Sequence, residues 1–312
     1  MNSPSTLSPR DVAIAMVDQG VMKHRTRYDK VFFKAVVAGA LLSTGGLLLE
    51  IIEGGSPSLN TANPGIVKIL GGFVFPVGLV MIVLTGQELL TSNMMVFPIA
   101  CLKRAVPWWG LAANWIIVLF GNLCGSLFFA SVLVKYSGII STAPYVQFAQ
   151  DLTIKKAGTP EWHQIFIRGI ACNWLVCIAV WQAAGSRETI SKIFAIWIPI
   201  WIFVSCGYDH VVATSDLANM FLVTLGMFFG ADLSVAEYIR KSLIAAFLGN
   251  VVGALCVVVP AVYFFLGDYD YQLDSRNLQG IEEGLNGTGV SVSEVKEDQE
   301  KDSVLQRMKR SD

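Results

Sequence analysis

Charged residues are scarce in this 312-residue sequence, and their scarcity is the first constraint on its class. Aspartate, glutamate, lysine and arginine make up 15% of the chain, whereas 54% of its residues are hydrophobic. A soluble domain carries about a quarter charged residues. The composition therefore argues against an ordinary soluble domain and predicts an integral membrane protein whose main partner is the lipid bilayer.

Groups that bind metals or drive common catalytic chemistry are also few. The three histidines, His24, His163 and His210, lie far apart, and no P-loop, Gly-x-Ser-x-Gly or haem-attachment motif occurs. We therefore expect no metal, no cofactor and no catalytic residues, which makes a membrane-embedded enzyme the weakest hypothesis. The net charge is −1 and no basic cluster is interleaved with aromatic residues, so no nucleic-acid partner is expected.

Cysteines and the N-terminal segment exclude two further interpretations. The six cysteines lie in or at the edge of apolar runs, which does not suggest an extracellular disulfide framework, and we expect them to be small core residues. The first 30 residues are polar and basic without an apolar core. No cleavable signal peptide is therefore expected.

Long apolar runs dominate the rest of the chain. A membrane-spanning helix needs about 20 mostly apolar residues. Six runs meet this length, and the second and fifth are interrupted by polar residues. The expected spans are residues 29–52, 66–102, 107–136, 162–184, 190–229 and 235–266.

The spans divide the chain into three expected parts. Residues 1–28 form an N-terminal segment, residues 29–266 the six-helix transport domain, and residues 267–312 a polar, mostly disordered tail. Lysine and arginine near the span ends favour both termini in the cytoplasm. We expect the plasma membrane as the location.

The two polar interruptions, residues 84–94 and 206–216, are the most informative stretches of the sequence. Each places small, polar and ionisable residues inside a run that is otherwise apolar enough to cross a membrane. Polar or unwound backbone at bilayer depth is costly unless it lines a cavity. A matched pair of breaks, one in each half, predicts a transport site.

An internal repeat relates the two halves at an offset of 128 residues. Residues 120–127 are echoed by residues 248–255, Phe75 corresponds to Phe203, and Glu88 to Asp216. Each half contains three spans, an odd number, so the second half must cross the bilayer upside down relative to the first. The sequence thus predicts an inverted repeat.

Polar residues of the repeat have two possible roles. Asn122 and Asn250 could each satisfy the open backbone of a broken helix or face the transport pathway, because a buried amide needs a partner. The carboxylates beside the breaks, Glu88, Asp209 and Asp216, are expected to hold loop backbone or to pair at the cytoplasmic mouth. The glycines around Asn122 and Asn250 have the spacing of close helix packing.

Four motifs resemble the formate–nitrite transporter family. They are Thr85-Gly86-x-x-Leu89-x-Thr91-x-Asn93, residues 172–177 (CNWLVC), residues 207–210 (GYDH) and residues 248–250 (LGN). The resemblance covers residues 12–265. The long charged tail looks more like that of the fungal nitrite-transporting branch than like the bacterial formate channels.

The resemblance implies an all-α, aquaporin-like protomer of six transmembrane helices, assembled as a homopentamer with one path through each protomer. It also implies roles for single residues. His210 is similar to the family's central histidine, with Thr91 facing it. The other implied positions are the pathway amides Asn173 and Asn250, the anion-attracting Lys156 with Lys155 as its alternative, the outer constriction of Phe75, Phe203 and Val176, and the inner constriction of Leu79 and Leu89.

The chemistry of a small anion fits this arrangement. A bare anion cannot cross a dry apolar constriction cheaply, so it must be held by donors or become its neutral acid on the way. His210, with an ordinary pKa near 6.5, suits either route. We expect transport of a small monovalent anion, either coupled to a proton or as the neutral acid, with nitrite first and formate, lactate or hydrosulfide as alternatives. A neutral-solute channel of the aquaporin type is less favoured, because two Asn-Pro-Ala motifs are missing.

Overall fold

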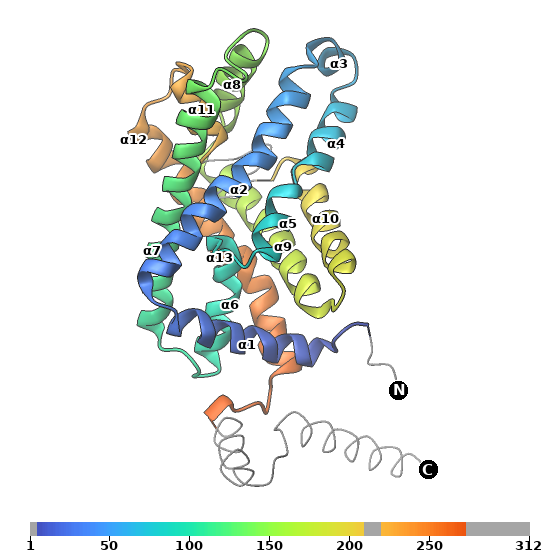
Figure 1. Cartoon of the computed structure of the whole chain (residues 1–312), viewed down its shortest axis with the longest axis vertical. Helices are drawn as coiled ribbons and strands as arrows, with labels where there is room; N and C mark the ends of the chain where they lie inside the picture. The colour runs from blue at the N-terminus through green and yellow to red at the C-terminus, as the bar shows by residue number, and fades with distance from the viewer. Residues whose placement is uncertain (1–4, 209–219, 273–312) are drawn as a thin grey trace.

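The computed structural model describes residues 5–208 and 220–272 and is entirely helical apart from one isolated bridge between Thr6 and Ser186. In the described part of the chain, six helices are long and apolar enough to cross a membrane (Figure 1). The six spans are α2 (Tyr28–Gly54), α4 with α5 (Pro64–Val74 and Val77–Leu84), α7 with the π-helix η1 (Trp108–Phe128 and Phe129–Tyr136), α9 (Trp162–Gly185), α10 (Thr189–Cys206), and α12, η3, α13 and η4 in succession (Val235–Glu237, Tyr238–Leu243, Ile244–Pro260 and Ala261–Phe265). The predicted all-α, six-span fold is confirmed.

The second span is broken as predicted. Its first part ends with α5 at Leu84, and the chain resumes as α6 (Leu90–Leu102). Gly86, in the intervening segment, has a φ of +66°, a left-handed conformation that favours glycine. The sequence break therefore corresponds to a real interruption of helical hydrogen bonding.

The fifth span also stops where a glycine permits it. Gly207 follows α10 with a φ of +80°, the left-handed conformation of a helix C-cap. The chain is helical again in α11 (Leu222–Phe228). Residues 209–219, which contain the predicted Asp209, His210 and Asp216, lie outside the described residues.

The two halves repeat one helix packing in opposite directions. Helix α2 leads away from α1, whereas α9 ends beside the N-terminal segment, where the Leu7 N–H donates to the Gly185 carbonyl at 2.8 Å. Gly125 of α7 packs on the Val36 carbonyl of α2, and Gly253 of α13 packs on the Ile170 carbonyl of α9. A Cβ at either glycine would overlap that oxygen, so the predicted close-packing role of these glycines is confirmed.

An N-terminal helix, α1 (Pro9–Arg25), was not foreseen from the sequence. Ser8 and Asp11 form its capping box, and its buried face includes Val12, Met16 and Val17. Helix α1 lies across the end of the bundle where the described chain begins and ends (Figure 1). The capping residues and the apolar residues of α1 are visible in the sequence, but the polar composition of the whole segment made the helix easy to miss.

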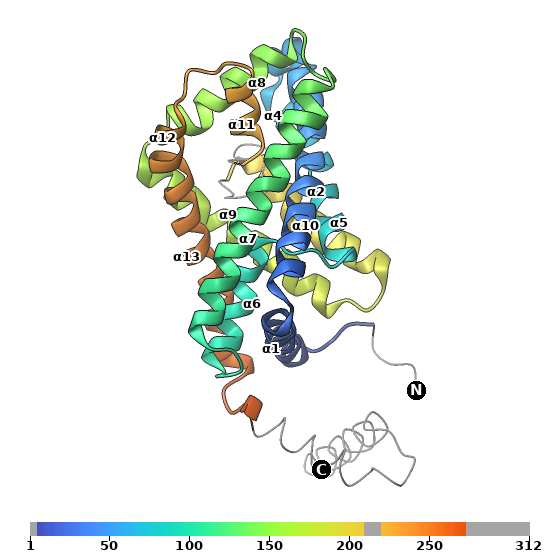
Figure 2. The ribbon, with the colours of Figure 1, turned by 60° about the vertical axis from the view of Figure 1, so that its left-hand side comes forward.

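The opposite end of the bundle is covered by shorter elements. These are α3 (Pro57–Ala62), α8 (Tyr145–Thr153) and η2 (Ile154–Gly158). Helices α8 and α11 pack together at this end, which we call the α8 end (Figure 1; Figure 2). The protomer therefore has an α1 end and an α8 end, with the break in the second span between them.

The cysteines only partly follow expectation. Cys101, Cys172 and Cys177 are buried, whereas Cys124, Cys206 and Cys256 are exposed on the protomer. The expectation that all six are core residues is wrong for the second three. They lie on helix faces that the protomer leaves uncovered, and all six have free thiols.

Candidate functional site

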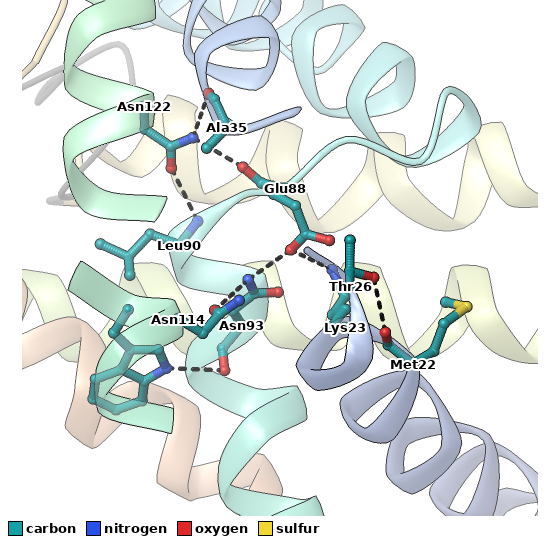
Figure 3. A network of polar contacts seen from close by, with 10 residues as sticks. Met22, Lys23, Thr26, Ala35, Glu88, Leu90, Asn93, Asn114 and Asn122 are labelled. Carbon is teal, nitrogen blue, oxygen red and sulfur yellow. Dashed lines mark hydrogen bonds and ion pairs between the residues drawn. The ribbon is translucent and has the colours of Figure 1, made fainter. Parts of the chain in front are cut away.

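Asn122 holds the start of α6, immediately after the break in the second span, against α2. Its side-chain Nδ2 donates to the carbonyl of Glu88 at 2.9 Å and to the carbonyl of Ala35 at 2.8 Å, and its Oδ1 accepts from the Leu90 N–H at 3.0 Å (Figure 3). The amide thus satisfies both a carbonyl before α6 and an N–H of its first turn. Of the two roles open from the sequence, Asn122 takes the structural one.

Asn250 occupies the equivalent place in the second half. Its Nδ2 donates to the Gly169 carbonyl of α9 at 2.9 Å, just as Asn122 donates to the Ala35 carbonyl of α2. Both asparagines are fully buried. The two halves therefore share this hydrogen bond as well as the residue identities, which supports the internal duplication.

Glu88 links the break to the N-terminal helix. Its Oε2 accepts from Lys23 Nζ of α1 and from Asn93 Nδ2 of α6, both at 2.8 Å (Figure 3). Asn93 also donates to Asn114 Oδ1 of α7 at 2.8 Å, and its carbonyl accepts from Trp115 Nε1 at 3.3 Å. Of the two roles expected for the Glu88 carboxylate, the structure shows pairing, because it binds side chains of α1 and α6 and not loop backbone.

We predict that Glu88→Gln lowers the unfolding temperature of the protein in detergent. The side chains of Lys23 and Glu88 are only 14% and 5% exposed, and removing one partner of a buried pair costs about 3–5 kcal/mol. The matched control is Asp29→Asn, which removes the exposed pair with Arg27 and is expected to cost below about 1 kcal/mol. Equal unfolding temperatures for the two variants would show that the Lys23 pair does not anchor the break.

A second polar group lies deeper in the protomer, at the start of α6. Asn173 Nδ2 of α9 donates to the Asn250 carbonyl at 2.8 Å and approaches the Thr91 carbonyl at 3.4 Å. All three residues are fully buried. The structure therefore brings together Thr91, Asn173 and Asn250, which the family resemblance had grouped.

Two polar atoms of this group are unsatisfied. Within the described residues, the Thr91 hydroxyl and Asn173 Oδ1 have no hydrogen-bond partner. A buried hydroxyl or amide oxygen without a partner costs about 1–3 kcal/mol, so such atoms call for an explanation. One explanation is that these atoms form hydrogen bonds with a transported substrate when it is bound.

The predicted constriction residues are all buried apolar side chains. Phe75, after α4, and Phe203, on α10, meet edge to face with ring centroids 6.4 Å apart. Leu79 on α5, Leu89 before α6 and Val176 on α9 belong to the same hydrophobic core. Phe75 and Phe203 come from equivalent positions of the two halves, so their contact lies where the repeats meet.

The lysine alternatives are separated by burial. Lys156 is 4% exposed within η2, whereas Lys155 is exposed. A buried lysine is rare, and this selects Lys156 as the residue to consider inside the α8 end. His210 lies outside the described residues, so its relation to Thr91 stays a prediction.

Three residues of the site were not predicted as members. Lys23 was counted only as a flanking charge, Asn93 only as a motif letter, and Asn114 was not considered. Asn93 and Asn114 are polar residues inside apolar runs, which was the available signal. Nothing in the sequence indicated that Lys23 reaches residue 88, because that contact spans 65 positions.

The fold and these polar groups define a membrane transport protein built from two inverted halves. Comparison with known proteins agrees: residues 10–265 match the family model described as formate/nitrite transporter. The chain belongs to the formate/nitrite transporter family, a family of transporters and channels and not of enzymes.

Individual relatives are similar over most of the chain. A probable formate transporter of Methanothermobacter thermautotrophicus is 35% identical over 83% of this chain and 96% of its own length. An uncharacterised transporter of Saccharomyces cerevisiae is 34% identical over 81% of this chain, which spans only 40% of that protein. These similarities place the whole helical domain in the family.

Solved structures share the fold. A pentameric formate channel with formate bound has a TM-score of 0.66 and 28% identity, covering 77% of this chain and 97% of that one. An ion channel of the same family has a TM-score of 0.70 at 24% identity, with 81% and 98% covered. The six-span architecture is therefore that of known channels.

Proposed function

We propose that this protein carries small monovalent anions across a membrane, nitrite first, together with a proton or as the neutral acid. The observation that carries this proposal is the Thr91 hydroxyl, which has no hydrogen-bond partner among the described residues and is buried beside Asn173, next to a broken helix. An anion needs donors where water is excluded, and the Thr91 hydroxyl is such a donor, whereas Asn173 Oδ1 could accept a hydrogen bond from the neutral acid. Formate is the main alternative, because relatives' names include formate transporters.

An anion entering the proposed path at the α8 end would meet its residues in the following order. Lys156 attracts the anion, Phe75, Phe203 and Val176 exclude water, and Thr91 with Asn173 and Asn250 receives the anion near His210. Leu79 and Leu89 form the second apolar constriction. His210 enters this scheme on the strength of its motif and its titration range alone.

We extend the proposal to the assembly and its placement. The similar channel of known structure is described as pentameric, and a homopentamer with one path in each protomer is proposed here. The exposed apolar faces of the spans would then contact lipid or neighbouring protomers. Both termini are proposed to face the cytoplasm, with the protein in the plasma membrane and residues 267–312 as a cytoplasmic tail.

Thr91→Val is predicted to weaken nitrite uptake into proteoliposomes by about 10- to 100-fold, the worth of one hydrogen bond to a charged group. Valine keeps the shape of threonine and removes only the hydroxyl. Thr85→Val is the matched control, since Thr85 lies at the other end of the break and donates to the Met81 carbonyl at 2.7 Å. Unchanged uptake by the Thr91 variant would contradict the proposed anion site.

A further inference from the structure

Glu50 is a buried carboxyl that none of the roles above explains. It lies in the last turns of α2, is fully buried, and neither carboxyl oxygen has a hydrogen-bond partner within the described residues. An ionised carboxylate in such a place is very costly, so the group is stable there as a neutral acid. A neutral acid is a proton donor without an acceptor.

The position of Glu50 is fixed by its neighbours on the same face of α2. Gly46, one turn earlier, packs against the Phe221 ring and Leu222. Gly54, one turn later, packs against Phe148 and Tyr145 of α8. Glu50 therefore lies between α11 and α8, inside the α8 end.

Glu50 lies further along α2 than the residue that packs on Phe75. Gly45 of α2 packs on the Phe75 carbonyl, and Glu50 lies five residues further along the helix. At about 1.5 Å per residue, this is an axial separation of about 7–8 Å. The acid thus sits on the α8 side of the proposed outer constriction.

Glu53 connects this acid to the surface. It is about one turn closer to the end of α2 and is 8% exposed. Its side chain lies against Gly71 of α4. Two carboxyls three residues apart on a helix are neighbours, and because the Glu50 oxygens make no hydrogen bond to Glu53, a proton would pass between them through a bridging water.

Few other ionisable groups lie on the elements around this part of α2. Helices α3, α5 and α11 contribute none. The groups on α4, α7, η1 and α8 are Lys68, Cys124, Lys135, Tyr136, Tyr145 and Asp151. Lys68, Cys124, Tyr136 and Asp151 are exposed, and Lys135 donates to the Phe228 carbonyl. Among the described residues of these elements, Glu53 on α2 and Tyr145 on α8, which packs against Gly54, are the remaining ionisable groups on this side of α2.

We propose that Glu53 and Glu50 form a proton relay that loads the transported anion at the α8 end, an inference that rests on the proposed function. Glu50 rests as the neutral acid, and its O–H bond breaks as an O–H bond forms on the anion, which becomes its neutral acid. The Glu50 carboxylate is then reprotonated by a bridging water, whose O–H bond breaks as the O–H bond of protonated Glu53 breaks to restore that water. Glu53 is reloaded by a hydronium ion of the solvent, which leaves as water.

Glu50→Gln in proteoliposomes tests the relay, with nitrite as the probe. Glutamine mimics the protonated acid but cannot release a proton. Net uptake driven by a gradient of one pH unit is expected to fall by about tenfold. A tenfold proton gradient can drive at most about a tenfold excess of an anion that moves with one proton, and the variant would lose that contribution. Nitrite–nitrite exchange at equal pH is expected to continue, and Glu188→Gln, an exposed carboxyl at the α1 end, should leave both rates unchanged.

The outcomes separate the relay from the proposed function. If the wild-type protein moves no nitrite or formate in either assay, the proposed function fails. If it does and Glu50→Gln keeps the wild-type net uptake, the relay alone is overturned. Should Glu50→Gln fail to assemble, infrared spectra of Glu53→Gln decide: a protonated-carboxyl band that changes when nitrite is added supports the relay, and its absence overturns it.

Discussion

Replacing Asn122 with leucine is expected to lower the unfolding temperature of the purified protein sharply and to abolish transport. Leucine has nearly the same shape but cannot make the three hydrogen bonds of the amide. The Leu90 N–H and the carbonyls of Glu88 and Ala35 would then be left unpaired in a buried site. At about 1–3 kcal/mol for each unsatisfied group, the total loss is at least about 3 kcal/mol.

The control for this prediction is Asn60→Leu. Asn60 is half-buried near the end of α3 and makes one side-chain hydrogen bond, to the Glu53 carbonyl at 2.6 Å. Its loss is expected to cost about 1 kcal/mol. Thermal unfolding in detergent and the size-exclusion profile measure both variants. If Asn122→Leu unfolds no earlier than Asn60→Leu, the amide does not hold the break.

His210→Ala is expected to abolish selective nitrite uptake while the protein still assembles. A positioned acid or base contributes about 10²–10⁴-fold, so the loss should be at least about a hundredfold. The reason is chemical: His210 is the one histidine in the two interrupted stretches, and imidazole changes charge near physiological pH. Without it the anion would meet the apolar constrictions as a bare charge.

His163→Ala is the matched control, because His163 is exposed at the start of α9. The third histidine, His24, contacts the Trp109 ring at the α1 end, with centroids 5.0 Å apart. Neither of these histidines lies in the two interrupted stretches, residues 84–94 and 206–216. Wild-type uptake by His210→Ala at normal expression would remove the histidine from the mechanism.

Much of the fold could be predicted because hydropathy is read residue by residue along the sequence and needs no knowledge of tertiary contacts. Six apolar runs predicted six spans. The break at residues 85–89 was predicted because polar residues are unfavourable in a lipid-facing helix. The glycine spacing gave the packing of α7 on α2, since only glycine permits that backbone approach.

The polar network was less predictable, because its partners meet only in three dimensions. Asn122 was left with two roles until its contacts with Leu90 and Glu88 were seen, 32 and 34 positions away. Lys23 looked like a flanking charge until α1 folded across the bundle and placed it on Glu88. Glu50 is an acidic residue near the end of a span, and it drew attention only because it is fully buried with no hydrogen-bond partner in the part of the chain that the structure describes.

Anion flux into proteoliposomes of the purified wild-type protein tests the central claim most directly. Nitrite, formate, lactate and hydrosulfide are compared one by one, with and without an inward proton gradient, against liposomes without protein. The account predicts protein-dependent nitrite uptake that the proton gradient increases and that exceeds uptake of the other anions. Nitrite and formate uptake equal to that of protein-free liposomes under a proton gradient would contradict it.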